Sequence, residues 1–313
     1  MNTDVSVKVS ICCMAYNHAP YIRSCIEGFL MQKTTFAYEI WIHDDVSTDG
    51  TSEIVREYAE KYPDKIAVVR PEINRYSTGN RAIVTNYLLP VARGTYIALC
   101  EGDDYWTDPS KLQRQIDILE KNPTYSACFH RTAVKKEGKS NGIRRAQRFD
   151  GPISVEQVIR WRSKFFATSS LVYRKNAMKD YPDFFKNCHV GDYPLMLWLS
   201  LQGTIYYVDR TMSVYRKGHS GSWSRHYLDC SQQERMSQLQ TELDMLDGFD
   251  RLTAHRYRHH IQEKKAMLRI YALWRYRDYD ALADPELKPF FRTLSIVRRW
   301  RIRTNMLINR MSC

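Results

Sequence analysis

Short apolar runs rich in β-branched residues alternate, over the first third of the chain, with segments whose apolar residues recur at helical spacing. The apolar runs predict β-strands at residues 7–13, 39–43, 66–70 and 96–100. The segments between them predict helices at residues 20–30, 52–62 and 80–92. Such alternation of strand and helix is typical of a parallel α/β sheet covered by helices on both faces, a three-layer α/β/α sandwich.

The second half of the chain is less regular. Residues 135–151 are polar and basic and predict a loop. Ser154 and Gln157 have the spacing of a capping box, which predicts a short helix that begins there. The other expected elements are a helix that residues 113–122 complete, a helix at 194–201, strands at 125–134 and 168–174, and a hairpin of residues 205–208 and 212–215.

From residue 228 onward the pattern is helical only, with much positive charge between the apolar positions. We therefore expect two parts, an α/β domain at residues 1–227 and a basic helical extension at residues 228–313. The tail at residues 292–310 mixes arginines with large apolar side chains. That mixture is typical either of an amphipathic segment at a membrane surface or of a helix that covers the domain through its apolar side.

Charge and cysteine usage limit the classes of protein that fit. The 313 residues include 47 basic and 35 acidic ones, a net charge of +12 that would attract nucleic acid, an anionic membrane or a phosphorylated substrate. No stretch reaches the roughly 18 apolar residues that a membrane span needs, and the chain starts without a basic leader or a cleavage site. The eight cysteines form no CxxC pair. We expect a reduced, cytoplasmic protein.

Three carboxylates, Glu101, Asp103 and Asp104, follow directly where the strand at residues 96–100 ends. Carboxylates at the end of a buried strand are costly unless a cation neutralises them. Oxygen ligands of this kind suit a hard divalent ion such as Mg²⁺ or Mn²⁺. Gly102 is expected to bend the backbone so that Glu101 and Asp103 face the same point.

The alternative interpretation of these carboxylates is a solvated acidic turn that caps the following helix. Asp108 and Pro109 already have the residue types of an N-cap and a first helical residue, so we expect the helix to begin there. With the cap accounted for, the carboxylates upstream need another explanation, and a metal site supplies one.

Polar residues also follow the other expected strands. Asn17 follows the first strand, and Asp44 and Asp45 follow the second. Right-handed crossovers place the carboxyl ends of parallel strands along one edge, where ligands of open α/β sheets bind. The chain has neither a GxGxxG after its first strand nor a GxxxxGK[ST] motif, so no glycine-rich phosphate loop is predicted. We expect a cation to hold phosphate instead.

Three motifs in order carry a resemblance to a known family: VSICCMAYNHAPYIRSCIEGFLMQ, EIWIHDDVSTDGT and YIALCEGDDYW. Together they resemble the N-terminal half of glycosyltransferase family 2, the inverting sugar-nucleotide transferases with the Rossmann-like GT-A fold. The segments GDYPL at residues 191–195 and VYRKGHS at residues 214–220 are similar to the acid-base and closing-loop motifs of that family. The bacterial members that build polysaccharides are the most similar.

The resemblance implies a donor site. Tyr16 would stack near the nucleobase, and Asp45, with Asp44 beside it, would accept a hydrogen bond from a uracil-like N–H. Asp103 would bind the metal that bridges the two phosphates. Glu101 occupies the first position of the usual Asp-x-Asp motif, where the family has Asp, which leaves open whether it ligates the metal directly. A turn cap is the alternative role for Asp44 and Asp45.

The resemblance further implies that Asp192 is the general base and that His219 is a late ligand to the metal or the diphosphate. A carboxylate on the face opposite the departing nucleotide would take the proton of the acceptor hydroxyl in one inverting step. The alternatives are an N-cap role for Asp192 and an ordinary loop position for His219.

The implied function is metal-assisted transfer of a sugar from a nucleoside-diphosphate sugar to a hydroxyl of a glycan or lipid-linked glycan. The expected donor is a UDP-sugar. The expected metal is Mn²⁺ or Mg²⁺. The alternative is a non-catalytic protein of the same fold that binds a sugar nucleotide or a glycan. Peripheral contact with the inner face of the cytoplasmic membrane is expected through the tail, and no nucleic-acid partner is expected because no recognition motif is present.

Overall fold

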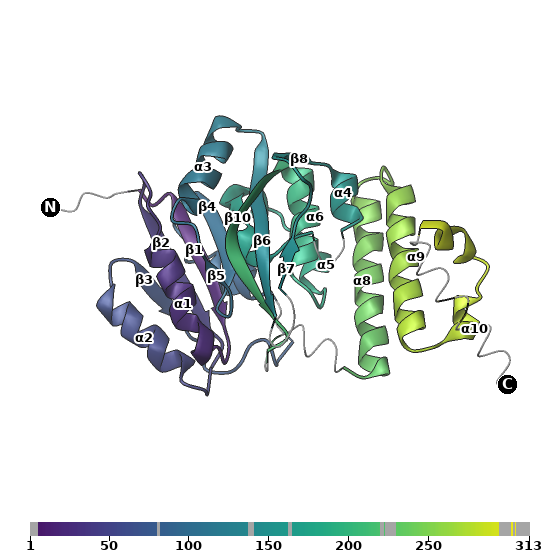
Figure 1. Cartoon of the computed structure of the whole chain (residues 1–313), viewed down its shortest axis with the longest axis horizontal. Helices are drawn as coiled ribbons and strands as arrows, with labels where there is room; N and C mark the ends of the chain where they lie inside the picture. The colour runs from purple at the N-terminus through teal and green to yellow at the C-terminus, as the bar shows by residue number, and fades with distance from the viewer. Residues whose placement is uncertain are drawn as a thin grey trace. The chain divides into compact units, whose positions relative to one another are not determined.

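The computed structural model describes residues 6–79, 82–136, 141–161, 165–219, 222, 230–293, 302 and 304. The chain forms two compact units, one of residues 1–186 with 190–228 and one of residues 187–189 with 229–313. The first unit contains the sheet and the second is helical (Figure 1).

A mixed sheet forms the centre of the first unit, with the strand order β3-β2-β1-β4-β9-β6-β10-β5. Its N-terminal part is parallel, as predicted, and consists of β1 (Val9–Ala15), β2 (Tyr38–Asp44), β3 (Ile66–Val69) and β4 (Tyr96–Glu101). The remaining strands are β5 (Tyr105–Trp106), β6 (Tyr125–Lys136), β7 (Gly142–Arg144), β8 (Gly151–Ile153), β9 (Val172–Arg174) and β10 (Thr204–Lys217). β9 is antiparallel to both β4 and β6, which makes the sheet mixed.

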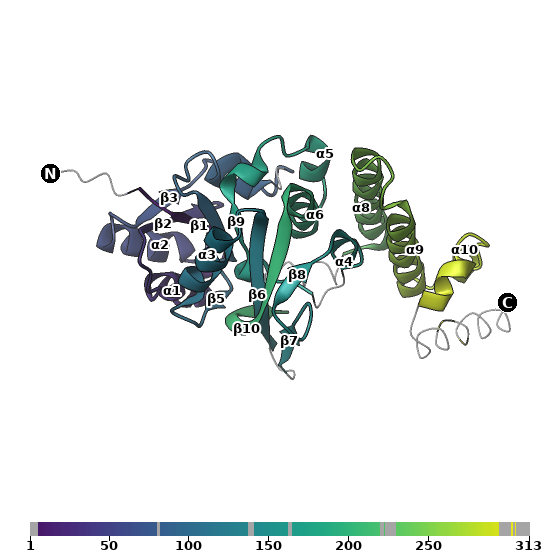
Figure 2. The same cartoon turned by 90° about the horizontal axis from the view of Figure 1, so that it is seen from above.

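Helices cover both faces of the sheet, which gives the predicted three layers. Figures 1 and 2 show α1 (Ala19–Leu30), α2 (Thr51–Lys61) and α3 (Lys111–Lys121) on one face, with α6 (Asp192–Gln202) and a π-helical turn, η1 (Val84–Leu88), on the other. Alternate residues of β1 pack against the first layer, because successive side chains of a strand point to opposite faces. Val9, Ile11 and Cys13 lie in that buried cluster together with Ile22 and Phe29 of α1.

Shorter helices complete the first unit. They are α4 (Val155–Ile159), η2 (Thr168–Ser170), η3 (Lys175–Met178) and α5 (Asp183–Lys186). The capping box predicted at Ser154 is confirmed, since the side chains of Ser154 and Gln157 bond reciprocally to each other's backbone N–H. The predicted strand at residues 168–174 is correct only from Val172, because residues 168–170 form a 3₁₀ turn.

Two predictions around β10 are wrong. The hairpin expected at residues 205–215 is a single strand that pairs with β6, with a register irregularity between Val208 and Ser213. The polar residues that suggested a turn are satisfied at a distance, since Asp209 accepts hydrogen bonds from Arg145 and Arg131. The loop expected at residues 135–151 instead contains the end of β6 and all of β7.

The start of α3 differs from the prediction by two residues. Ser110 is the N-cap residue and Lys111 the first helical residue. Asp108 accepts hydrogen bonds from the backbone N–H and the hydroxyl of Ser110, and it also receives a bond from Arg210. Asp108 therefore fixes the approach to the helix rather than capping it.

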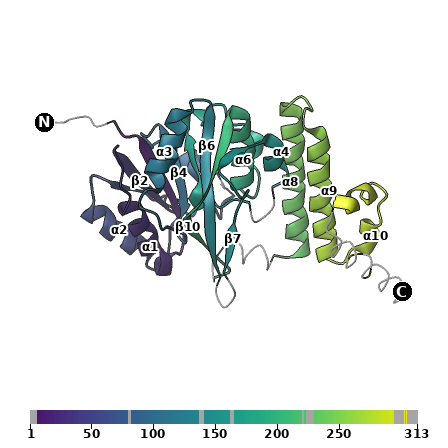
Figure 3. The same ribbon diagram turned by 45° about the horizontal axis from the view of Figure 1, so that its top comes forward.

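The second unit is built from α8 (Gln232–Leu252), α9 (Arg258–Arg275), α10 (Tyr279–Leu282) and a 3₁₀ segment, η4 (Lys288–Thr293). α8 and α9 lie side by side (Figure 3), and Leu239 and Leu243 of α8 pack on Ala272 of α9. In the part of the chain that the structure describes, no helix has both the length and the apolar character to cross a bilayer. The membrane-binding tail predicted at residues 292–310 falls almost entirely outside the described residues.

Candidate functional site

The carboxyl ends of β1, β2 and β4 meet at one edge of the sheet. Ala15 is level with Asp44 of β2, and Met14 is level with Glu101 of β4. Backbone hydrogen bonds continue past the strands, from Asp45 N to Ala15 O at 3.0 Å and from Gly102 N to Met14 O at 2.8 Å. The acidic segments after β2 and β4 therefore flank the segment after β1, as predicted from the strand order.

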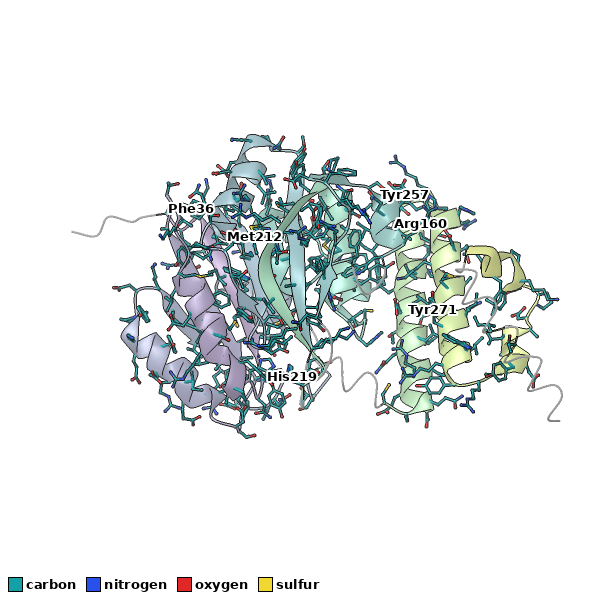
Figure 4. The ribbon with its side chains drawn as sticks, viewed as in Figure 1. Phe36, Arg160, Met212, His219, Tyr257 and Tyr271 are labelled. Carbon is teal, nitrogen blue, oxygen red and sulfur yellow. The ribbon has the colours of Figure 1, made fainter. Side chains whose placement is uncertain are left out.

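His219 lies at the same edge, although it is 116 residues from Asp103 in the sequence. It follows β10, and Figure 4 shows it at the opposite end of the sheet unit from Phe36, which precedes β2. Its imidazole Nε2 lies 2.9 Å from Oδ2 of Asp103, and both side chains are buried. The structure thus brings together the two residues that the sequence suggested as metal ligands.

Arg216 holds the acidic segment in place from β10. Its backbone N–H donates to Oδ1 of Asp104 at 2.9 Å, and its guanidinium donates to the carbonyl oxygen of Asp103 at 2.6 Å and to the hydroxyl of Ser24. The guanidinium also lies over the rings of Tyr21 and Tyr105. Sequence reasoning included Arg216 in a motif but gave it no role, because only the register of β10 shows that it faces the acidic segment.

The carboxylates do not share one protonation state. Burial and the charges of Asp103 and Asp192 raise the pKa of Glu101 to about 8, although Arg144 opposes the change. Burial, with the charges of Asp103 and Glu101, raises the pKa of Asp104 well above its usual value. Burial alone would raise the pKa of Asp103 too, but the hydrogen bond from His219 and the charge of His18 lower it. Asp103 is therefore the ionised member of the cluster.

Two buried carboxylate oxygens of the acidic segment have no hydrogen-bond donor among the described residues. They are Oδ1 of Asp103 and Oδ2 of Asp104. Buried acceptors without a donor are costly, and a cation beside Asp103 would satisfy its Oδ1. Carboxylate oxygen and imidazole nitrogen are both ligands for Mn²⁺, whereas Mg²⁺ prefers oxygen alone.

His18 is a further residue at this edge, and the sequence gave it no role. Its backbone N–H bonds to the hydroxyl of Thr51, while its Nδ1 is buried beside Gly102 and has no partner among the described residues. A Cβ atom on residue 102 would lie 2.8 Å from that nitrogen. The backbone turns at Gly102 as expected, since Asp104 N donates to Glu101 O at 3.0 Å, but φ is not positive there. The missing side chain of Gly102 leaves space for His18 and Ile22.

Asp45 binds a loop of its own chain. Its carboxylate accepts hydrogen bonds from the backbone N–H groups of Arg75 and Tyr76, at 2.7 and 2.9 Å, and its backbone oxygen accepts one from Asn74. A carboxylate offers about four lone-pair directions, so two remain for other donors, one of them toward His43 Nε2 at 3.4 Å. Tyr16, at the end of β1, is 48% exposed, as a side chain that stacks on a ligand must be.

Asp44 points the other way, into the protein. Its oxygens accept hydrogen bonds from the backbone N–H of Ser47 and the hydroxyl of Ser52, and Arg70 lies 3.5 Å away. These bonds fix the turn before α2, which is the capping role left open for Asp44. Neighbouring Val46 has a φ of 63°, which a β-branched residue adopts only under strain.

Asp192 is the first residue of α6, and the N-cap position belongs to Gly191. Its Oδ1 accepts a hydrogen bond from the backbone N–H of Tyr193 at 2.8 Å. α6 packs on β6 and β10 on the face of the sheet opposite α1. The charge of Asp192 reaches Glu101, which places Asp192 near the acidic segment but on the α6 face.

Two tryptophans, Trp106 and Trp223, stand close to site residues in the sequence. Trp106 is buried, donates from Nε1 to the carbonyl of Ser169 and packs edge-on against Phe29, so it belongs to the core. Trp223 lies outside the described residues, as does Arg81.

Comparison with known proteins agrees with the geometry. The family model described as Glycosyl transferase family 2 matches residues 10–182. An uncharacterized protein of Mycobacterium tuberculosis is 36% identical over 71% of this chain, and the matched region spans 62% of that relative's length. The Escherichia coli UDP-Glc:alpha-D-GlcNAc-diphosphoundecaprenol beta-1,3-glucosyltransferase WfaP is 27% identical over 69% of this chain and 79% of its own.

Solved structures give the fold. Staphylococcus aureus TarS 1–349 in complex with UDP-GlcNAc superimposes with a TM-score of 0.62 at 18% identity, over 91% of this chain and 78% of that one. The mannosyltransferase PcManGT from Pyrobaculum calidifontis, in complex with GDP-Man and Mn²⁺, has a TM-score of 0.56 at 15% identity, over 96% of this chain and 85% of its own. These similarities confirm the GT-A fold. Since the family model also covers more than half of the residues, including the three strand ends that form the site, the chain belongs to glycosyl transferase family 2.

Proposed function

We propose that this protein transfers a sugar from a nucleoside-diphosphate sugar to a hydroxyl group of a glycan or a lipid-linked glycan. A UDP-sugar is the first candidate donor. One observation carries the proposal: Asp103 and His219 form a buried pair at the same sheet edge as Asp45. In a family that acts on nucleotide sugars, that arrangement offers a cation site for the diphosphate. Beside it, Asp45 offers a carboxylate for the nucleobase.

In this proposal Asp103 and His219 hold a divalent ion, Mn²⁺ or Mg²⁺, and Glu101 and Asp104 lie beside it. When bound, the ion would neutralise negative charge on the departing nucleoside diphosphate. Arg216 keeps the acidic segment in position through its bonds to the main chain of Asp103 and to the side chain of Asp104. The arrangement favours His219 as a ligand, because its Nε2 already faces Asp103.

The nucleobase would lie between Tyr16 and the loop that Asp45 holds. The exposed ring of Tyr16 offers a stacking surface, and the remaining lone pairs of Asp45 can accept an N–H from the base. Base recognition and the position of residues 74–76 would then depend on the same carboxylate.

Asp192 would act as the general base. It stands on the α6 face of the sheet, whereas the nucleotide residues follow β1 and β2. A base on the far side of the sugar from the leaving group can take the proton of the acceptor hydroxyl as that oxygen attacks the anomeric carbon. This geometry inverts the anomeric configuration.

The test is a panel of sugar nucleotides with and without Mn²⁺, read first as thermal shift and then as product formation. UDP-glucose and UDP-GlcNAc, the donors named for the Escherichia coli and Staphylococcus aureus proteins, are the first candidates. A ligand that binds the folded state but not the unfolded state stabilises the protein by RT ln(1 + L/Kd), where L is the free ligand concentration, and so raises the melting temperature. The proposal predicts a Mn²⁺-dependent shift with a UDP-sugar, and a panel without any nucleotide-dependent shift would overturn it.

A further inference from the structure

Three cationic side chains come from neighbouring strands on one face of the sheet. Lys136 of β6 is level with Lys217 of β10, and in a parallel pair such residues point to the same face. Arg144 of β7 is opposite Thr132 of β6, four residues before Lys136, so it also points to this face. We call Lys136, Arg144 and Lys217 the cationic triad.

The guanidinium of Arg144 reaches along the sheet toward the two lysines. It stacks on the ring of Tyr215, 4.0 Å from the ring centroid, and donates one hydrogen bond to the carbonyl of Phe166. Tyr215 is two residues from Lys217, a spacing of about 6.6 Å along a strand. The guanidinium therefore lies one side-chain position from the lysines and keeps N–H groups for another acceptor.

The triad makes no direct ion pair within 4 Å with a carboxylate among the described residues, although the charge of Arg144 acts on Glu101. All three side chains are half-buried. Like charges gathered on a partly desolvated surface repel one another and attract an anion.

The triad borders the β4 carboxylates on the side away from the nucleotide residues, and the charge of Arg144 acts on Glu101. The nucleotide residues follow β1 and β2, on the far side of the β4 carboxylates in the strand order. The side chain of Arg216, whose neighbours Tyr215 and Lys217 point the opposite way, reaches Ser24 of α1. The triad therefore occupies the α6 face, the face of the proposed base Asp192.

We propose that the cationic triad binds a phosphate-bearing group of the acceptor, a glycosyl diphosphate, and so places the acceptor hydroxyl against the Asp192 carboxylate. A diphosphate matches three positive charges better than the single charge of a uronic acid does, and the guanidinium fork suits two phosphate oxygens. The inference deepens the proposed function and rests on it for the identity of the acceptor.

Methyl phosphate is the binding probe, titrated calorimetrically into protein saturated with UDP and Mn²⁺ so that the donor site is filled. The proposal predicts salt-sensitive binding that weakens at least about tenfold when Arg144→Gln is combined with Lys217→Ala. Lys135→Ala is the matched control, because Lys135 is an exposed neighbour that points to the opposite face. UDP affinity should be unchanged in every variant, and melting temperatures check that each variant is folded.

Three results would overturn the inference. The first is that methyl phosphate fails to bind the UDP-saturated protein, and the second is that it binds wild type and the double variant equally. The third is that the double variant loses UDP affinity together with methyl phosphate affinity, which would assign the triad to the donor. Capture by phosphatidylglycerol vesicles without methyl phosphate binding would point to a membrane surface instead, and would equally overturn it. If methyl phosphate binds through the triad but no sugar is transferred, the result contradicts the proposed function and still supports an anion site at the triad.

A transfer assay then identifies the source of the phosphate. An alkyl glycosyl diphosphate and the alkyl glycoside of the same sugar are compared as acceptors. Loss of Lys217 and Arg144 should raise KM for the diphosphate and leave KM for the glycoside unchanged. An equal change for both acceptors would contradict a phosphate contact.

Discussion

Nε2 of His219 lies 2.9 Å from Oδ2 of Asp103, and this bond joins the segment after β10 to the acidic segment after β4, 116 residues earlier. Both side chains are buried, and the hydrogen bond helps to keep Asp103 ionised against the effect of its burial. The other oxygen of Asp103 has no donor among the described residues. In the proposed function, Asp103 is therefore already ionised, with one oxygen available to a cation.

Asp103→Asn should weaken Mn²⁺-dependent UDP binding strongly, because the amide removes the negative charge while the shape is kept. His219→Gln should cost roughly 10- to 100-fold in metal affinity, the usual effect of losing a ligand or its orienting partner. Titration of Mn²⁺ in the presence of UDP measures both effects. Asp183→Asn is the control, since Asp183 is an exposed acid of α5 paired only with Lys186. Unchanged Mn²⁺ titrations in both site variants would argue against this metal site.

Asp192→Asn should abolish most transfer and leave donor binding intact. The asparagine oxygen can still accept the N–H of Tyr193, so α6 should keep its start, but the amide cannot take a proton. Loss of a general base typically lowers the rate by about 10²- to 10⁴-fold. Single-turnover rates and UDP affinity are compared in the same preparation. Full turnover by this variant would exclude Asp192 as the base.

Asp45→Ala should loosen residues 74–76 as well as weaken nucleotide binding. Without the carboxylate the backbone N–H groups of Arg75 and Tyr76 lose their acceptor. Both bonds are part-buried, so each loss costs less than the roughly 1–3 kcal/mol of a fully buried unpaired donor. Hydrogen exchange of residues 71–79 should therefore speed up in the free protein. Asn74→Ala is a comparison that keeps the carboxylate, because it removes the bond to the backbone oxygen of Asp45 and the bond from the Ser77 N–H. Exchange that stays at the wild-type rate in Asp45→Ala would show that the loop does not depend on this carboxylate.

Much of the donor edge could be predicted from the sequence because it depends on local patterns. The apolar runs locate β1, β2 and β4, and the rule that parallel strands end at one edge then brings Asp45 and Asp103 together. The two neighbouring carboxylates Asp44 and Asp45 could not be told apart in this way. Their difference depends on which face each side chain takes: Asp44 bonds to Ser52 of α2, and Asp45 bonds to the loop at residues 74–76.

The second half was harder to predict because its polar residues are satisfied by distant partners. Asp209 interrupts the apolar pattern of β10 and suggested a turn, yet its charge is balanced by Arg131 and Arg145, which precede it by more than sixty residues. The same holds for His18, whose place beside Gly102 depends on how β1 and β4 pair. Sequence periodicity contains no information on such long-range contacts.

Lys111→Met should stabilise the protein and change its pH dependence. Lys111 is fully buried at the start of α3, its Nζ has no acceptor among the described residues, and it lies over the Trp106 ring at 3.8 Å. Burial lowers the pKa of this amine to about 7, from 10.5. Between these pH values the unfolded chain is protonated and the folded chain is not, so the free energy of unfolding rises with pH by about 1.4 kcal/mol per unit. Below about pH 7 the penalty of the buried charge is fully present.

The comparison of wild type with Lys111→Met isolates this effect, because every other titrating group is shared. Methionine keeps an unbranched apolar side chain, one atom shorter, and removes the charge that lies over Trp106. The variant should therefore be more stable at neutral pH, by an amount that shrinks as the pH rises toward 10.5. Urea unfolding from pH 6 to pH 10 measures the difference, and Lys121→Met, at the exposed end of α3, is the matched control. Parallel stability curves for wild type and Lys111→Met would mean that this amine stays protonated in the folded protein, with the Trp106 ring compensating for its burial.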